Sequence, residues 1–148
     1  ALALARELRH PFNLAYAAGW AALYFDSVGR LRDAIAVADE AIAAAETYDF
    51  PFWLGVATIF RGHARARDGD PAGGCHQLRE GLARWRDTGA RLAGSIYANL
   101  LADACLAAGD LDAAAAALDE AAAHAAATGE IVASAETERL RAAWLRQC

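Results

Sequence analysis

Few residues in this chain have the types and spacing that metal binding or catalysis requires. Cys75 and His76 are adjacent, and together with His63 they could supply three zinc ligands. No second pair with ligand spacing accompanies them, whereas structural zinc sites have four ligands. Asp68-Gly69-Asp70 resembles the start of a calcium loop, but the remaining oxygen ligands are absent. We therefore expect no metal site, and a turn followed by a helix cap at Asp68-Gly69-Asp70.

The sequence also lacks the motifs of the common enzyme chemistries. The chain has no Lys, so it cannot form the phosphate-binding loop that ends in Lys, and no His-Glu-x-x-His occurs. No local motif frames a Ser or Cys nucleophile with His and an acid. We expect a non-enzymatic chain that uses no cofactor.

Arg61 and Arg65 are one helical turn apart and share a face. Two interpretations stay open for them. They pair with acids of a neighbouring helix, for which the candidates are Asp33, Asp39 and Glu40, or they bind an acidic ligand.

The elements that position these residues repeat every 40 residues without insertion. Pro11-Phe12 recurs as Pro51-Phe52 and, changed, as Arg91-Leu92. A fixed period of this size is typical of a helical solenoid. Small residues recur in the same columns: Ala22, Gly62 and Ala102; Gly29, Gly69 and Gly109; Ala34, Gly74 and Ala114; Ala41, Gly81 and Ala121.

Each repeat is predicted to be an antiparallel pair of helices. The first helices start near Pro11, Pro51 and Arg91, because Pro suits the first helical turn, and they end before the shared glycine. Asp70 and Asp110 are predicted N-caps of the second helices, and Arg30 is a poorer one. The divisions are the end of a preceding repeat (1–10), three repeats (11–50, 51–90 and 91–130) and a terminal helix from Ile131 to about Arg146 within 131–148. Because the chain begins inside a helix of the repeat and lacks Met, we expect a segment of a longer protein.

The recurring small residues predict close helix contacts. Gly62 and Ala102 lie midway along first helices, and the small residues of the second helices are seven apart, which places them on one face. We expect these positions to be buried where antiparallel helices meet. Cys75 and Cys105 are expected in the core, and Cys148 on the surface.

This pattern resembles the tetratricopeptide repeat, which has a small residue in its first helix, a turn Gly, and two Ala in its second helix. The matching sets are Ala22-Gly29-Ala34-Ala41, Gly62-Gly69-Gly74-Gly81 and Ala102-Gly109-Ala114-Ala121. The resemblance implies a right-handed all-α solenoid. This chain departs from that family in three ways. Its period is 40 residues rather than 34, and a period of 40 matches armadillo and HEAT repeats equally well. Arg61 and Arg65 stand where the family has apolar residues, and the terminal Pro of the repeat is missing.

Three segments are similar to the C-terminal repeats of large bacterial signalling proteins: ALALARELRHPFNLAYA, FPFWLGVATIFRGHARA and HQLREGLARWRDTGARL. Those proteins join a nucleotide cyclase or a LuxR-type DNA-binding domain to an ATPase and to long-unit tetratricopeptide repeats. The similarity implies a repeat module of a signalling or transcriptional regulator, in which the repeats sense a partner or inducer. Three Cys are an odd and small number for a disulfide framework, so we expect free thiols and a cytoplasmic protein.

In the resembled family the first helices line a concave groove that binds a protein or peptide. Matched by column, the groove would present Tyr16, Gly19, Leu23, Asp26, Val56, Ile59, His63, Arg67, Ile96, Asn99, Asp103 and Leu106. The alternative is that these residues pack against neighbouring repeats or stay solvated.

Composition limits the class of partner. The net charge of -5 argues against direct nucleic-acid binding, and no stretch is apolar enough to span a membrane. Leu2, Leu4 and Leu8 lie at an uncapped repeat end, where self-association is expected. Two functions remain: a scaffold for protein–protein interaction, or a sensor whose groove closes on a small-molecule effector and relays a change in curvature to an output domain.

Overall fold

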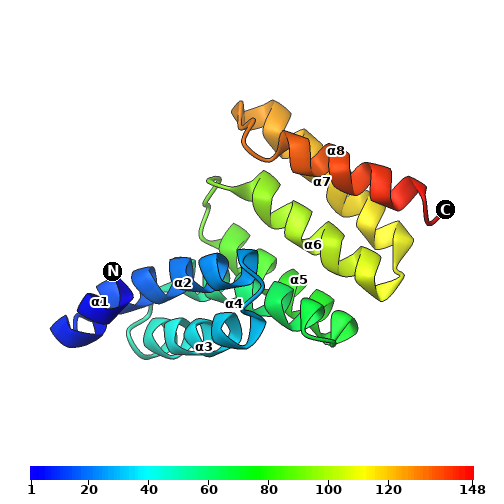
Figure 1. The fold of residues 1–148 in the computed structure, drawn as a ribbon. Helices are drawn as coiled ribbons and strands as arrows, with labels where there is room; N and C mark the ends of the chain where they lie inside the picture. Colours follow the sequence, from blue (N-terminus) through cyan, green and yellow to red (C-terminus); the bar gives the residue numbers. More distant parts are fainter. The chain divides into compact units, whose positions relative to one another are not determined.

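The computed structural model describes residues 1–148, which form eight helices and no strand (Figure 1). A half-helix precedes seven further helices, as the repeat predicts. The helices are α1 (Leu2–Leu8), α2 (Pro11–Ser27), α3 (Leu31–Thr47), α4 (Pro51–Arg67), α5 (Pro71–Asp87), α6 (Gly94–Ala108), α7 (Leu111–Thr128) and α8 (Ser134–Leu145).

The chain divides into two compact units, Ala1–Ala90 and Arg91–Cys148, and the division coincides with a predicted repeat boundary. In the first unit α2 pairs with α3 and α4 with α5, while α4 also packs against α2 and α3. In the second unit α6 pairs with α7, and α8 packs against both. Within each unit, neighbouring helices thus pack in the solenoid-like order that the period predicts. None of the helices combines the length and hydropathy needed to cross a bilayer.

The turns inside each pair follow the expected chemistry. Gly29, Gly69 and Gly109 have φ of 78°, 108° and 74°, a left-handed conformation that glycine adopts without steric cost. Asp70 and Asp110 then cap the next helices, accepting hydrogen bonds from Gly73 N at 3.0 Å and Ala113 N at 3.2 Å. Arg30 makes no side-chain cap, as predicted.

Two helix starts differ from the prediction. The helix expected from Arg91 begins at Gly94, and the helix expected from Ile131 begins at Ser134. These two repeat units lack the Pro that begins α2 and α4, so nothing sets the first turn at that column. A short turn replaces it in each case, and Ala93 adopts a left-handed φ of 66°.

Helices α4 and α5 approach so closely that four glycines are needed between them. A Cβ on Gly62 would lie 2.8 Å from Leu78 N and 3.0 Å from Gly74 O, and a Cβ on Gly81 would lie 2.7 Å from Ile59 N. Gly55 is equally tight, with Trp85 N at 2.8 Å. The predicted burial of Gly62 and Ala102 is confirmed, because both are buried.

Candidate protein-interaction site

A row of aromatic side chains lies exposed along α2 at four-residue spacing. Phe12, Tyr16, Trp20 and Tyr24 retain 44%, 49%, 38% and 61% of their surface, although most large apolar side chains of a small protein are buried. We call these four residues the α2 ridge. Residues four apart share a helix face, so the ridge forms one continuous stripe.

The ridge is held in place by α4. Three of its four rings meet the buried Trp53 edge to face: Tyr16 at 5.0 Å, Trp20 at 6.2 Å and Phe12 at 6.4 Å between ring centroids. The fourth, Tyr24, contacts Phe25 of α2 itself at 5.6 Å. Trp20 also contacts Phe60 at 6.3 Å. Edge-to-face contacts of this kind are favourable beyond the area that they bury. One side of the ridge is therefore packed and ordered, while the other faces solvent.

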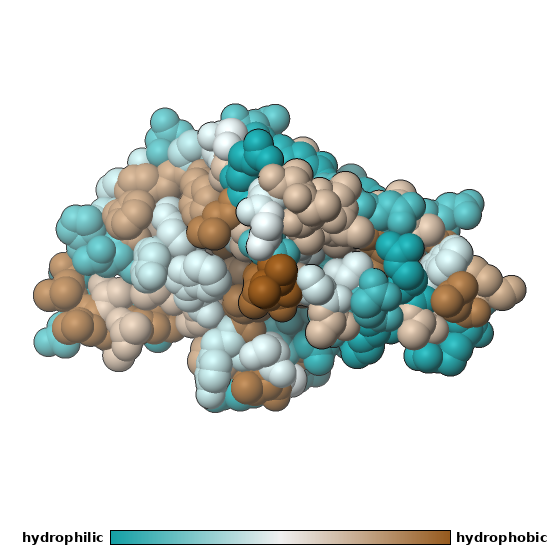
Figure 2. Space-filling view, turned by 90° about the horizontal axis from the view of Figure 1, so that it is seen from above, coloured by the Kyte–Doolittle hydropathy of each residue, from teal (hydrophilic) through white to brown (hydrophobic).

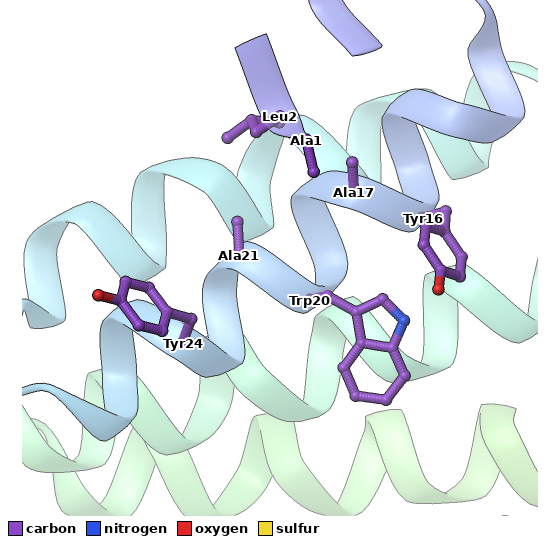
Figure 3. A pocket seen from close by; sticks show the side chains of 7 residues that line it. All are labelled: Ala1, Leu2, Tyr16, Ala17, Trp20, Ala21 and Tyr24. Atoms are coloured by element: carbon purple, nitrogen blue, oxygen red, sulfur yellow. The ribbon is translucent and has the colours of Figure 1, made fainter. Parts of the chain in front are cut away.

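Beside the ridge is a hollow of about 380 Å³ between α1 and α2. Figure 3 shows Ala1 and Leu2, at the start of α1, above Ala17, with the side chains of Tyr16 and Trp20 directed to the opposite side of α2. The lining is Ala1, Leu2, Tyr16, Ala17, Trp20, Ala21 and Tyr24. The small side chains of Ala17 and Ala21 leave this space between larger neighbours.

The solvent-facing surface of α2 carries no charge. The only ionisable acid or base in Pro11–Ser27 is Asp26, which is 4% exposed; two tyrosines supply the polar groups at the ridge. Depletion of charge and enrichment of Tyr and Trp distinguish the cores of protein interfaces from other surface. The composition of α2 therefore resembles that of an interface core.

Asp26 fastens the end of α2 to α4. Its carboxylate contacts His63 Nδ1 at 2.7 Å, and Arg67 donates both to that carboxylate, at 3.1 Å, and to the Asp26 carbonyl, at 2.7 Å. The side chains of Asp26 and His63 are only 6% and 7% exposed. The cluster thus joins three of the predicted groove residues, Asp26, His63 and Arg67. Asp103, another residue of the predicted groove, lies in the second unit and forms an ion pair with Arg139 at 3.6 Å.

The structure distributes the predicted groove residues over three environments. Tyr16 and Arg67 are exposed, whereas Leu23, Ile96 and Asp103 are half-buried. The buried members are Gly19, Asp26, Val56, Ile59, His63, Asn99 and Leu106. Asn99 donates to Ala133 O and Thr137 Oγ1, so its amide joins α6 to α8. Partner binding by this set stays a prediction, and in this structure the buried members do not offer side chains to a partner.

The structure gathers a serine, a histidine and an acid in the second unit, which no sequence motif had indicated. Glu130 accepts hydrogen bonds from Ala93 N at 2.9 Å, from Ser95 N at 3.1 Å and from the Ser95 hydroxyl. His124 Nε2 lies 2.8 Å from the Arg91 carbonyl and 4.0 Å from Glu130. Gly94 gives the imidazole its space, because a Cβ there would overlap the ring.

The chemistry of this trio is that of a helix cap. The Ser95 hydroxyl donates to a carboxylate rather than to the histidine, and Ser95 is fully buried, so its oxygen is not presented to a substrate. Burial by itself raises the pKa of the Glu130 carboxyl, but the hydrogen bonds from Ser95 and Ala93 outweigh burial and hold its pKa below the ordinary value. Burial, with the Glu130 charge nearby, raises the pKa of Tyr97 to about 12.

The residues considered as metal ligands have other contacts or other environments. His63 faces Asp26, whereas His76 is exposed on α5, and no group of three or more His, Cys, Asp or Glu is arranged to hold a metal ion. Cys75 and Cys105 are buried and Cys148 is exposed, as predicted.

Arg61 and Arg65 both form ion pairs. Arg61 Nε lies 2.7 Å from Asp39, one of the expected partners, whereas Arg65 pairs with Asp70 at 2.5 Å on the turn before α5. Of the other candidates, Asp33 pairs with Arg30 and Glu40 with Arg6. The ion-pair interpretation thus accounts for both arginines.

The chain matches no known protein-family model, and it has no significant sequence match among the curated proteins. Its assignment as a helical-repeat chain accordingly rests on its own 40-residue columns and on the helix pairs that they form.

Proposed function

We propose that this chain is a non-enzymatic module for protein–protein interaction, and that its working surface is the α2 ridge. The observation that carries the proposal is an ordered, uncharged and solvent-exposed row of four aromatic side chains. Aromatic residues are the usual anchors of protein interfaces, because they bury a large area with few rotatable bonds. The recognised ligand is a protein segment with apolar side chains.

The biological setting follows from the resemblance of the repeat columns. Tetratricopeptide-like columns with a long unit support a module within a cytoplasmic bacterial signalling or transcriptional regulator, where it acts as a scaffold. In such a protein the module supplies recognition, and the attached domains supply the output.

Sensing of a small-molecule effector is the second candidate, and the hollow beside the ridge favours it. A volume of about 380 Å³ falls within the range of ligand pockets. However, its lining has few polar groups to orient a ligand: the hydroxyls of Tyr16 and Tyr24 and the indole N–H of Trp20. Protein recognition therefore has the stronger support.

The proposal can be tested with a displayed library of helical peptides selected on the immobilised chain. Binding of the selected peptides is then measured by fluorescence anisotropy. Replacing Tyr16 and Tyr24 by Ala should weaken binding more than tenfold, which corresponds to about 1.4 kcal/mol. The matched control is Tyr48→Ala, which removes a tyrosine that is 54% exposed on the turn after α3 and should leave the affinity unchanged.

Circular dichroism of each variant verifies that the helices persist. Equal affinity of the ridge variant and the wild type would show that the ridge is not the working surface. Loss of binding in the Tyr48 variant alone would place the surface at the α3–α4 turn.

A further inference from the structure

The middle repeat carries polar residues in three columns where the other two repeats are apolar. The matched sets are Ala18, Thr58 and Ala98; Ala21, Arg61 and Leu101; and Val37, Gln77 and Ala117. Apolar side chains therefore satisfy the packing of the repeat at these columns. Burying a polar side chain there costs free energy, and yet Thr58 and Gln77 are only 5% and 8% exposed.

These three polar residues line one hollow of about 150 Å³ between α3, α4 and α5. The rest of its wall comprises two apolar and three charged residues, which are Ile42, Leu54, Glu46, Glu80 and Arg84. No lining residue belongs to α2. The hollow is therefore separate from the ridge, and what it binds does not depend on the proposed function.

The amide of Gln77 brings a hydrogen-bond donor without a partner to this hollow. Its oxygen accepts from Arg65 Nη1 at 3.4 Å, and because a guanidinium can only donate, the amide nitrogen turns the other way. No acceptor of the chain lies within hydrogen-bond distance of that nitrogen. A buried donor that stays unpaired is destabilising, so an acceptor that enters the hollow is favoured.

The charged side chains of the wall have capacity for both signs of charge. Arg84 pairs with Glu80 at 2.9 Å, whereas Arg61 approaches Asp39 through Nε alone, at 2.7 Å. The two terminal nitrogens of Arg61 make no hydrogen bond within the chain, and Glu46 has no polar partner. The hollow thus has a free guanidinium edge and a free carboxylate as well as the amide donor.

We propose that the hollow binds a free α-amino acid with a small side chain. The ligand's carboxylate accepts from Gln77 Nε2 and from the terminal nitrogens of Arg61, since guanidinium–carboxylate hydrogen bonds are among the strong ones. Its ammonium group donates to Glu46, and its side chain lies against the apolar part of the wall. A carboxylate alone would face Glu46 as a like charge, and an amine alone would face Arg61. A zwitterion satisfies both.

The volume of the hollow limits the ligand. About 150 Å³ corresponds to about five water molecules at about 30 Å³ each. Pockets for drug-sized ligands start at about 300 Å³, twice this volume. The hollow therefore suits glycine, alanine or serine and excludes long or aromatic side chains. Ordered water is the competing occupant, and the ligand must displace it.

The hollow differs in chemistry from the exposed apolar surface of the same unit. Leu4 and Leu8 of α1 are 56% and 60% exposed, and hydrophobic atoms gather at the left-hand end of Figure 2, which α1 occupies in Figure 1. None of these residues lines the hollow. An apolar partner and a polar ligand would accordingly use separate surfaces.

Nuclear magnetic resonance of the ¹⁵N-labelled chain tests the site directly, because the side-chain amide of Gln77 reports on its own contacts. The chain has only four side-chain amides, those of Asn13, Gln77, Asn99 and Gln147. L-alanine should shift the Gln77 amide with a dissociation constant of about 1 mM. The amide of Asn99, which donates to Ala133 O and Thr137 Oγ1, is the internal control and should not move.

Two fragments of the same ligand test the need for both charges. Propionate lacks the ammonium group of alanine, and ethylamine lacks its carboxylate. Each should bind more than tenfold more weakly than L-alanine. Glu46→Gln should weaken the binding of L-alanine but strengthen that of propionate, because it removes the acceptor for the ammonium group and the repulsion of the carboxylate.

The repeat itself supplies variants that should fold. Arg61→Leu and Gln77→Val install the residue types found in the same columns at Leu101 and Val37. Both should weaken L-alanine binding more than tenfold, as followed by backbone amides around the hollow. Arg32→Leu, at an exposed arginine of α3 that does not line the hollow, should leave the affinity unchanged. Circular dichroism verifies that the helices persist.

Four outcomes would overturn the inference. The first is no shift of the Gln77 amide at about 20 mM L-alanine, which would leave water as the occupant. The second is equal binding of L-alanine and either fragment. The third is parallel movement of the Asn99 and Gln77 amides, which would indicate a general solvent effect. The last is unchanged affinity in the folded Arg61 and Gln77 variants.

Discussion

The glycine contact between α4 and α5 predicts that the same substitution will have opposite effects at two buried helical sites. At Gly62, a Cβ would lie 2.8 Å from Leu78 N and 3.0 Å from Gly74 O. At Gly19, in the middle of α2, the nearest atom to a Cβ would be a ring carbon of Trp53 at 3.4 Å, an ordinary contact. Both glycines are buried within helices.

Two opposing effects set the sign of the change in unfolding free energy at each site. Replacing a helical Gly by Ala favours folding by about 1 kcal/mol through backbone entropy. Gly19→Ala should keep most of this gain. At Gly62 the obstructing atoms are backbone atoms of α5, so the two helices must move apart by about 0.5 Å, and overpacking of this kind costs about 1–3 kcal/mol. Gly62→Ala should therefore be net destabilising by about 1 kcal/mol.

Urea unfolding followed by circular dichroism measures both variants. With a denaturant slope of about 2 kcal/mol per M, the midpoint should fall by about 0.5 M for Gly62→Ala and rise by up to about 0.5 M for Gly19→Ala. A midpoint that rises equally for both variants would refute the close approach of α4 and α5. A fall for both would instead refute the space beside Trp53.

Two further contacts give predictions of direction and size. The pKa of Glu130 in the folded chain lies below its ordinary value of 4.5, so the contribution of its carboxylate to stability is present above about pH 4.5 and is lost as the pH falls through the folded pKa. Glu130→Gln should therefore lower the urea midpoint at pH 7 more than at pH 3. An equal loss at both pH values would contradict the role of Glu130 as a cap. Asp26→Ala removes the buried acid, leaves His63 and Arg67 without their carboxylate, and should lower the free energy of unfolding by about 2–3 kcal/mol. Asp26→Asn keeps an acceptor oxygen and should lower it less. Equal unfolding midpoints for the two variants would contradict the stabilising role of the cluster.

The helix pairs could be predicted from the sequence because their determinants are local and recur. Pro at the start of a helix, Asp at a cap and Gly at a turn each act within a few residues, and the 40-residue period repeats them. The predicted starts of α6 and α8 were wrong because these two helices lack such a local determinant. Where the column lacks Pro, the first turn of α6 is set by Glu130, 35 residues from Ser95, and nothing in a local window indicates so distant a cap.

The candidate surface was only partly accessible to sequence reasoning. The first helices carry several large apolar side chains, of which Tyr16 and Trp20 are exposed. Ile59, Phe60 and Tyr97 belong to the same pattern but are buried. Column matching treats all repeats as equivalent, whereas burial depends on which repeat has a neighbour on that face. The four-residue spacing of the ridge can be read from the sequence. Only the structure shows that these residues of α2 are exposed, whereas the residues in the same columns of α4 are buried.

The reach of Glu130 has a consequence for the order in which the second unit forms during synthesis. The ribosome synthesises α6 about 20 residues before Glu130, whose carboxylate caps the first turn of α6. The N–H groups of Ala93 and Ser95 therefore have no Glu130 acceptor until α7 has been synthesised. The start of α6 is thus fixed only when the α7–α8 junction closes back on it. A nascent chain released between Ala108 and Glu130 would carry a frayed helix with an apolar face exposed to other chains and to chaperones.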